Sequence, residues 1–493
     1  MAERAPQLPR ADVCVVGAGP AGLAVARALG RAGRRVVLLE SGADGASPIA
    51  AELADGDHEG EPYEGLRATR HRGVGGTSNI WDVDVEGQPG AKYVPLDPGD
   101  FADWPIGPEE LAPFYREAQA LCGLGPFDYG AARWAGPDRR PFDLSGTGLV
   151  SGVYQFGTAD RFTGELPAEL RRTEAVTLVP STTVVGLTDG ASGRSIGGVR
   201  AVGPEGDPVE IEARRVVLAC GAVENARLLL RAGLGGRDGL AWLGRGFMEH
   251  ARDFSMTLVP GTPAVFSEAA FYDLHEPAEG VRVGGRLGLA AEAREAHDLP
   301  NAALTLIPRA RGTTRPGLWG RIRGRLRGGG AGRETRYGWS RVADPAGAYD
   351  VFGLVLNLEQ RPDVGNRVEP GDRRDRFGHR LPRLVLRWSD EEQARLERLR
   401  GLLAGWLRDA GLGELSYEAG RRPDLSAHHH AGTTRMAASP DEGVVDPDAR
   451  VFGVEGLYVA GASVFPTAGY ANPTLTVVAQ ALRLAEHLDG ELG

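Results

Sequence analysis

The sequence is poor in cysteine and almost free of lysine, and it has no long hydrophobic run. Its three cysteines are Cys14, Cys122 and Cys220. They lack the spacing of metal ligands, and an odd number does not suit a disulfide framework, so a reducing cytoplasm is the expected location. No stretch approaches the roughly 18 apolar residues that a membrane span needs, and the first residues lack the apolar core of a signal peptide.

The overall composition is that of a globular protein. Of its 493 residues, 42% are hydrophobic and 25% are charged, and this length allows two or three domains. Lys92 is the only lysine among 56 basic residues, yet the net charge is −10. Because an acidic chain repels phosphates, nucleic acid is not an expected partner.

The N-terminal region has the pattern of a strand, a helix and a second strand. Ala11 to Val16 and Arg35 to Leu39 are short apolar runs, and Pro20 to Ala32 has helical apolar spacing. Two strands joined by a helix run parallel with a right-handed crossover. The region therefore predicts an α/β fold.

A glycine-rich turn joins the first of these strands to the helix. Gly17 permits the tight turn, Gly19 lets a pyrophosphate approach the backbone, and Gly22 lets the helix pack closely on the strand. Glu40 follows 18 residues after Gly22 and can accept the ribose hydroxyls. The pattern predicts dinucleotide binding without distinguishing FAD from NAD. The expected contacts are Gly17, Gly19, Pro20, Ala21, Gly22, Glu40 and Ser41.

Two further strand–helix units lie far along the chain. Arg215 to Ala219 precedes a predicted helix from Glu224 to Arg231, and Gly456 to Ala460 precedes a final helix from Pro473 to Leu488. If the three units share one sheet, the cofactor domain is discontinuous, and the segments between them form a second domain.

The intervening segments predict their own helices and strands. We expect helices over Phe101 to Gly123 and Ser389 to Ala410, the latter capped by Ser389, and strands over Val351 to Leu358 and Leu384 to Trp388. The Arg- and Gly-rich stretch 309–336 is expected to be a mobile loop or a lid.

Four segments, in this order, resemble the glucose–methanol–choline (GMC) oxidoreductases, a family of FAD enzymes. They are VGGTSNIW at 74–81, CGAVENAR at 220–227, EQRP at 359–362 with NRV at 366–368, and the block from His429 to Thr476. The resemblance covers nearly the whole chain and is nearest to the bacterial branch around pyranose 2-oxidase and glycoside 3-oxidase. It implies a Rossmann-like FAD domain plus an α+β substrate domain with a large antiparallel sheet.

The resemblance also implies domain boundaries and cofactor contacts. The FAD domain is expected over 8–95, 176–255 and 422–493, and the substrate domain over 96–175 and 256–421. Ile80 stands where pyranose 2-oxidase has the histidine that bonds covalently to flavin, so non-covalent FAD is expected. The further implied contacts are Gly75, Gly76, Thr77, Ser78, Asn79, Trp81, Val184, Cys220, Gly221, Ala462, Ser463, Asn472, Pro473 and Thr474.

Alcohol oxidation needs a proton acceptor beside the hydroxyl, and the tract His428-His429-His430 offers three imidazoles. A metal site is an alternative use of such a cluster, but the tract lacks Cys or acidic ligands at a suitable spacing, and no metal is expected. The family motif places its base three residues before Gly432, at His429, and its second active-site residue at Asn472. Asn472 with Pro473 also has the pattern of a helix N-cap, which would occupy the amide.

The expected function is oxidation of an alcohol, a sugar, glycoside, cyclitol or similar polyol, to a carbonyl, with hydride passing to flavin N5. A non-sugar alcohol, an aldehyde hydrate and a non-catalytic FAD-binding role are the alternatives. The implied partners are the small-molecule substrate and O2 or another electron acceptor, and the sequence leaves a homo-oligomer open. Asp82 and Asp84 are candidates for holding sugar hydroxyls or an ammonium group, or else they face solvent.

Overall fold

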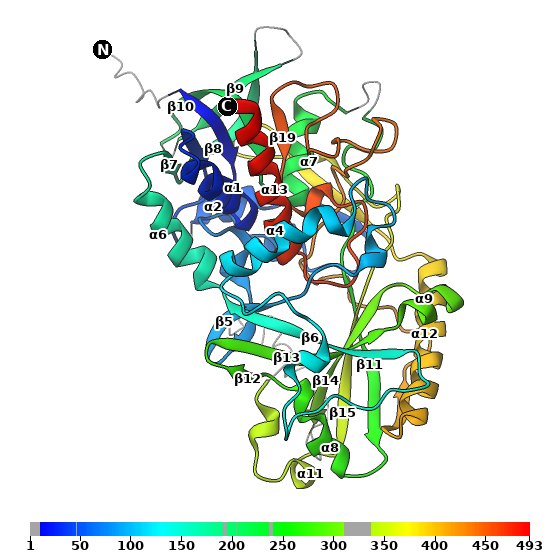
Figure 1. Cartoon of the computed structure of the whole chain (residues 1–493). Helices are drawn as coiled ribbons and strands as arrows, with labels where there is room; N and C mark the ends of the chain where they lie inside the picture. Colours follow the sequence, from blue (N-terminus) through cyan, green and yellow to red (C-terminus); the bar gives the residue numbers. More distant parts are fainter. Residues whose placement is uncertain (1–9, 46, 191–194, 204, 236–239, 310–336) are drawn as a thin grey trace.

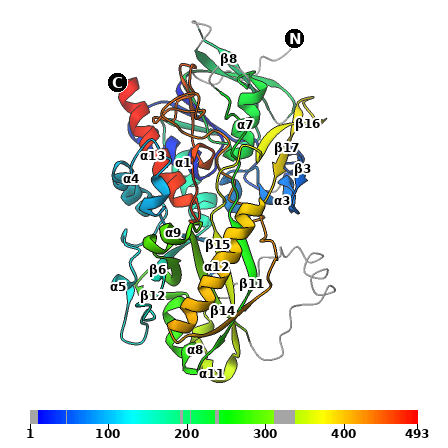
Figure 2. The same ribbon diagram turned by 90° about the vertical axis from the view of Figure 1, so that its right-hand side faces the viewer.

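The computed structural model describes residues 10–45, 47–190, 195–203, 205–235, 240–309 and 337–493. Two large sheets organise the molecule (Figures 1 and 2). One lies with the C-terminal end of the chain in the upper part of Figure 1, and the other forms the lower part. The stretch 310–336, most of the predicted loop or lid, lies outside the described residues.

The upper sheet is built from segments far apart in the sequence. Its parallel strands run in the order β7, β2, β1, β10, β19, and the first half of β10 pairs antiparallel with β9 and, through it, β8. The three predicted units therefore share one sheet, which confirms a discontinuous α/β domain. The bounds are β1 (Ala11–Val16), β2 (Val36–Leu39), β7 (Val176–Val179), β8 (Thr183–Asp189), β9 (Ile196–Val202), β10 (Pro208–Leu218) and β19 (Leu457–Val459).

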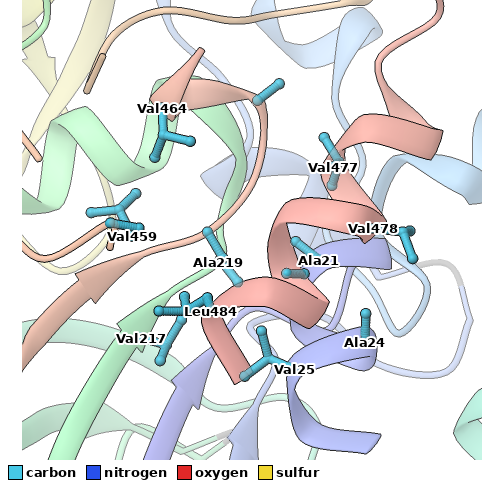
Figure 3. Packing of buried hydrophobic residues seen from close by; sticks show 14 of the residues in the cluster. Ala21, Ala24, Val25, Val217, Ala219, Val459, Val464, Val477, Val478 and Leu484 are labelled. Atoms are coloured by element: carbon cyan, nitrogen blue, oxygen red, sulfur yellow. The ribbon is translucent and has the colours of Figure 1, made fainter. Parts of the chain in front are cut away.

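Two helices from opposite ends of the chain pack against each other on this sheet. They are α1 (Pro20–Arg31) and α13 (Thr474–Leu492), and α4 (Pro108–Leu121) lies against α13. Figure 3 shows small side chains of α1, among them Ala24 and Val25, facing Val478 and Leu484 of α13. Burying each Val or Leu contributes about 1.5–3 kcal/mol, so this contact joins the two termini firmly.

The lower sheet is antiparallel, in the order β18, β11, β15, β14, β13, β6, β5, β4, with β12 beside β13. Its apolar face belongs to the same buried cluster as the leucines of α12 (Asp390–Asp409), which crosses the sheet in Figure 2. The bounds are β4 (Val83–Val85), β5 (Gln88–Tyr93), β6 (Leu149–Thr158), β11 (Ala251–Pro260), β12 (His275–Ala278), β13 (Val281–Leu289), β14 (Ala302–Arg309), β15 (Val351–Leu358) and β18 (Gly413–Tyr417).

A third, small sheet joins β3 (Asp57–Gly60), β17 (Arg380–Leu386) and β16 (Arg367–Arg374). The remaining elements are short. They are α2 (Pro48–Leu53), α3 (Leu66–Thr69), α5 (Ala131–Trp134), α6 (Leu166–Arg171), α7 (Gly221–Arg231), α8 (Ala264–Glu268), α9 (Ala291–His297), α11 (Pro345–Ala348), the 3₁₀ turns η1 (Gly76–Ile80), η2 (Pro98–Phe101), η4 (Ala269–Tyr272), η5 (Trp339–Arg341) and η6 (Ala462–Val464), and the π turn η3 (Arg161–Glu165).

The strand pairing departs from the domain division expected above. β4 and β5 belong to the antiparallel sheet although they fall within 8–95. Conversely, α4 and α6, expected in the substrate domain, pack against α13 and α1. The sequence order of segments does not reveal such crossings, because pairing partners far apart in the chain decide them. None of the helices in the described part of the chain combines the length and hydrophobicity of a membrane span.

Candidate active site

A long cavity lies where the two sheets meet, and the nucleotide-binding turn forms one of its walls. Its lining includes the β1–α1 turn, the end of β2, residues 71–72, η1, the start of α7, residues 427–430 and the start of α13. Apart from residues 71–72, these are segments that the sequence motifs single out, and the fold brings them around one space.

The glycines of the turn stand where side chains would clash. Gly17 has φ +104°, and a Cβ there would lie 2.6 Å from the carbonyl oxygen of Ala219. A Cβ on Gly22 would lie 1.8 Å from the carbonyl oxygen of Gly17, so helix and strand pack as closely as the sequence predicts. A Cβ on Gly76 would lie 2.8 Å from Cα of Gly19, so the two glycine-rich segments meet back to back. This glycine-lined wall fits a dinucleotide pyrophosphate.

Glu40 is held rigidly at the end of β2. Its Oε2 accepts from the N–H of Ala18 and its Oε1 from the N–H of Gly42, both at 2.9 Å. Burial raises the pKa of Glu40, while these two backbone bonds lower it. A carboxylate has about four lone-pair sites, more than these backbone N–H groups occupy, so the Glu40 oxygens can also accept a hydroxyl group from the cavity. The position suits the ribose contact expected of Glu40.

Arg72, which sequence reasoning missed, lies beside this carboxylate. Its Nη1 donates to Ser41 Oγ at 3.0 Å, its Nη2 lies 2.9 Å from Glu224, and its buried Nε has no partner among the described residues. An unpartnered buried donor on the cavity wall suits an anionic or hydroxyl-bearing ligand. No local motif marks Arg72, so only the fold could identify it.

Most of the predicted cofactor residues reach the cavity, and four do not. Gly22 packs helix on strand, Gly75 donates its N–H to Ala18, Asn79 bonds its own loop, and Ser463 accepts from Asn225. Those that line the cavity are Gly17, Gly19, Pro20, Ala21, Glu40, Ser41, Gly76, Thr77, Ser78, Trp81, Val184, Cys220, Gly221, Ala462, Asn472, Pro473 and Thr474. Asp82 and Asp84 are exposed, although Asp82 borders the cavity mouth, and Asp84 accepts from the N–H of Gly87.

The two predicted catalytic residues meet at one end of the cavity. Asn472 Nδ2 lies 3.2 Å from His429 Nε2. Helix α13 begins at Thr474 without a side-chain cap, so the Asn472 amide is not spent on capping. The other ring nitrogen of His429, Nδ1, lies 2.8 Å from Nδ1 of His250.

Glu249 fixes the backbone around this histidine pair. Its Oε1 accepts the N–H of His429 at 2.6 Å and that of His250 at 3.0 Å. Burial raises the pKa of Glu249 to about 8. The pairing of Met248 with Ala431 sets these two chain segments side by side.

The other two histidines of the tract point elsewhere. His430 Nε2 lies 2.5 Å from the hydroxyl of Tyr63, and His428, with φ +65°, lies 3.3 Å from Glu64. Among the described residues, no group of three or more His, Cys, Asp or Glu side chains has the arrangement of a metal site.

Both paired histidines are neutral near pH 7. Burial lowers the pKa of His250 to about 4. Burial also holds the pKa of His429 well below its usual value, and the positive charges of Arg252 and Lys92 lower it further. A neutral imidazole that presents an unprotonated nitrogen to the cavity can accept a proton from a bound alcohol.

Two segments of the chain match models of known protein families. The model described as "GMC oxidoreductase" matches residues 366–481, and the one described as "FAD binding domain" matches residues 10–50. The C-terminal part of the chain therefore contains a GMC oxidoreductase domain. The chain uses FAD, and it is an alcohol oxidase or dehydrogenase.

The chain is also similar to individual oxidases. A C-glycoside 3-oxidase from Microbacterium trichothecenolyticum is 34% identical over 30% of this chain and 29% of its own length. The paromamine 6'-oxidase of Streptomyces fradiae is 25% identical over 98% of this chain and 92% of its own. Among solved structures, a pyridoxine 4-oxidase from Mesorbium loti has 18% identity and a TM-score of 0.57, covering 97% of this chain and 99% of its own, and so shares the fold.

Proposed function

We propose that this protein oxidises a hydroxyl of a sugar, glycoside or similar polyol, with His429 as the proton acceptor and Asn472 as the group that orients the substrate oxygen. The observation that carries the proposal is the 3.2 Å contact between His429 Nε2 and Asn472 Nδ2 in the cavity that the dinucleotide turn also lines. FAD supplies the hydride acceptor when it is bound.

Hydrogen bonds around His250 support Nε2 of His429 as the basic atom. His250 Nε2 lies 3.4 Å from the carbonyl oxygen of Ala468, and a carbonyl only accepts, so this nitrogen carries the proton. Neutral His250 then has a lone pair on Nδ1, which accepts from Nδ1–H of His429. His429 Nε2 is left unprotonated and faces Asn472.

The chain's own residues then divide the task. His429 Nε2 takes the hydroxyl proton of the substrate, while the Asn472 amide donates to the same oxygen and holds it. Asn cannot itself act as a base at neutral pH. A positioned base of this kind typically contributes about 10²–10⁴-fold in rate.

The polyol assignment is supported by relatives whose names record oxidation of C-glycosides and of paromamine. The alternatives are a non-sugar alcohol or an aldehyde hydrate, and a non-catalytic FAD-binding role. A non-catalytic FAD-binding role does not require His429 and Asn472 to face the cofactor cavity, so their pairing there favours an enzyme. A cytoplasmic location, O2 or another electron acceptor and a homo-oligomer remain predictions.

Anaerobic incubation of the holoenzyme with sugars, glycosides, cyclitols and simple alcohols tests the proposal. We expect polyols to bleach the flavin absorbance and to yield the matching carbonyl, with simple alcohols much slower. Bleaching by simple alcohols alone would contradict the polyol assignment. Unchanged flavin with every compound would favour the non-catalytic role.

A further inference from the structure

One face of the antiparallel sheet is polar and basic. Strand register places Lys92 of β5 beside Phe156, and hence on the face that carries Tyr154 of β6 and Arg286 of β13. The same register continues through Ala303 to Asn357 and Arg252. The opposite face carries the leucines that belong to the cluster around α12. We call Lys92, Tyr154, Arg252 and Arg286 the basic platform.

The basic platform is near the catalytic histidine. Lys92 and Arg252 both lower the pKa of His429, and Lys92 also lowers that of His250. Burial first, and then the charges of Arg252 and Arg286, lower the pKa of Lys92 itself to about 8. The chain's only lysine is therefore mostly charged at neutral pH. Arg252 Nη2 donates to the carbonyl of Ser426, three residues before His429, so this end of the platform adjoins the histidine tract.

Two of these cations have no acidic partner among the described residues. Lys92 Nζ lies 4.5 Å from the ring centroid of Tyr154, and Arg286 lies 5.1 Å from that of Tyr470. Asp97 and Asp100 reach Arg286 only as distant charges, because their oxygens bond the side chain of Asn301. Arg252 differs, since it pairs with Asp424.

Buried donors on this face also lack partners. Arg286 is 8% exposed, yet its Nε is unpartnered, as is Nε of Arg252. The Tyr154 hydroxyl, Thr305 Oγ1 and Asn357 Nδ2, on the same face, are unpartnered too. An unpaired buried polar group destabilises the fold, so a row of them indicates a ligand that satisfies them.

Glycines clear the space that Arg286 occupies. A Cβ on Gly288 would lie 2.8 Å from its Nη1, and one on Gly152 would lie 3.1 Å from its Cζ. Both glycines belong to the strands that form this face. The Arg286 guanidinium therefore packs directly against the backbone of the sheet at these two positions.

We propose that the basic platform binds an anionic group, a carboxylate or a phosphate, on the polyol substrate. The inference rests on the proposed function and names its substrate class: an acidic sugar or sugar phosphate. Lys92 and Arg286 supply the charge, and the guanidinium fork matches the paired oxygens of either group. The hydroxyls and amide on the same face are left for the sugar ring.

Binding to a non-turning-over holoenzyme tests the inference. In the His429→Ala holoenzyme, the shift in oxidised flavin absorbance gives Kd for D-glucose, D-glucuronate and D-glucose 6-phosphate. We expect one of the two anions to bind about ten- to a hundredfold more tightly than glucose, and the choice between them identifies carboxylate or phosphate. Equal Kd values for all three sugars would overturn the inference.

Substitutions test which residues cause the tighter binding of the anionic sugar. Lys92→Met and Arg286→Met should each remove most of it while leaving glucose binding and the flavin spectrum in place. Arg282→Met is the matched control, since Arg282 lies on the same strand and face but pairs with Glu86. Persistence of the preference in both platform variants would overturn the inference, and a shifted flavin potential in them would assign these cations to the cofactor instead. Failure of every polyol to reduce the wild-type flavin is a separate result that contradicts the proposed function.

Discussion

His250 and His429 face each other through their Nδ1 atoms, 2.8 Å apart. Only one proton fits between these two nitrogens, and the bond from His250 to the Ala468 carbonyl assigns it to His429. The buried histidine therefore sets which nitrogen of its neighbour is free to act as a base. This makes His250 a positioning residue.

Replacing His250 tests that role. His250→Phe removes the acceptor for Nδ1–H of His429, so the limiting rate of flavin reduction should fall about 10- to 100-fold with little change in KM. His250→Asn retains an acceptor oxygen and should recover part of the rate. Stopped-flow reduction measures both, and equal rates for the two variants would show that His250 only fills space.

The pH dependence follows from the lowered pKa of His429. Because the folded enzyme keeps this imidazole neutral well below its usual pKa, flavin reduction should stay constant from pH 8 down to about 6.5, the unperturbed value. The acid limb should appear only below that pH. A limb centred at or above pH 6.5 in the reduction rate of a neutral sugar would contradict the assignment.

Lys92 predicts a second, alkaline effect that is specific to anionic ligands. Its pKa of about 8 means that the charge is lost as pH rises through 8, while the pKa of Arg286 is raised above its ordinary value and that of Tyr154 is raised to about 12. Affinity for the anionic sugar should fall above pH 8, and glucose affinity should not. In Lys92→Met this difference should vanish; its survival would exclude Lys92 as the titrating group.

Adding one methyl group at Gly22 is expected to destabilise the protein and to prevent it from keeping its cofactor. Gly22→Ala places a Cβ 1.8 Å from the Gly17 carbonyl, so we expect destabilisation of about 3 kcal/mol or more and apoprotein on purification. Gly405→Ala in α12 is the matched control, because its Cβ meets nothing within 4 Å and should stabilise the helix by about 0.4–1 kcal/mol. Thermal unfolding and flavin content measure both. A yellow Gly22→Ala protein of normal stability would contradict the packing.

The cofactor is expected to be released by acid. Ile80 lines the cavity, and an alkyl side chain forms no bond to flavin. Precipitation with trichloroacetic acid should leave the yellow colour in the supernatant. A yellow pellet would identify a covalent link elsewhere, with His71, which also lines the cavity, the first residue to examine.

The sequence predicts the local parts of this site well. Gly22 and Glu40 act through neighbours within one strand–helix–strand unit, so spacing alone places them, whereas the close contact at Gly17 comes from the distant Ala219. His429 and Asn472 come from the ordered motifs, and the fold places their side chains in contact. The cap at Ser389 is predicted for the same local reason.

The remaining residues depend on strand pairing between distant segments. His250 meets His429 because Met248 pairs with Ala431, and no spacing within either segment records that pairing. Lys92 and Arg286 share a face through β6, which pairs with both of their strands. The rarity of lysine is visible in the sequence, but the position of Lys92 on the sheet face that also carries Arg286 and Arg252 is not.

The most direct test of His429 as the proton acceptor is the anaerobic rate of flavin reduction by a polyol in the His429→Ala variant. The His487→Ala variant is the control. His487 lies on α13 beside Glu491, away from the cofactor cavity. We expect His429→Ala to keep its flavin spectrum and to reduce about 10²–10⁴-fold more slowly than wild type, with His487→Ala unchanged. A wild-type rate of flavin reduction in the His429→Ala variant would show that His429 is not the base.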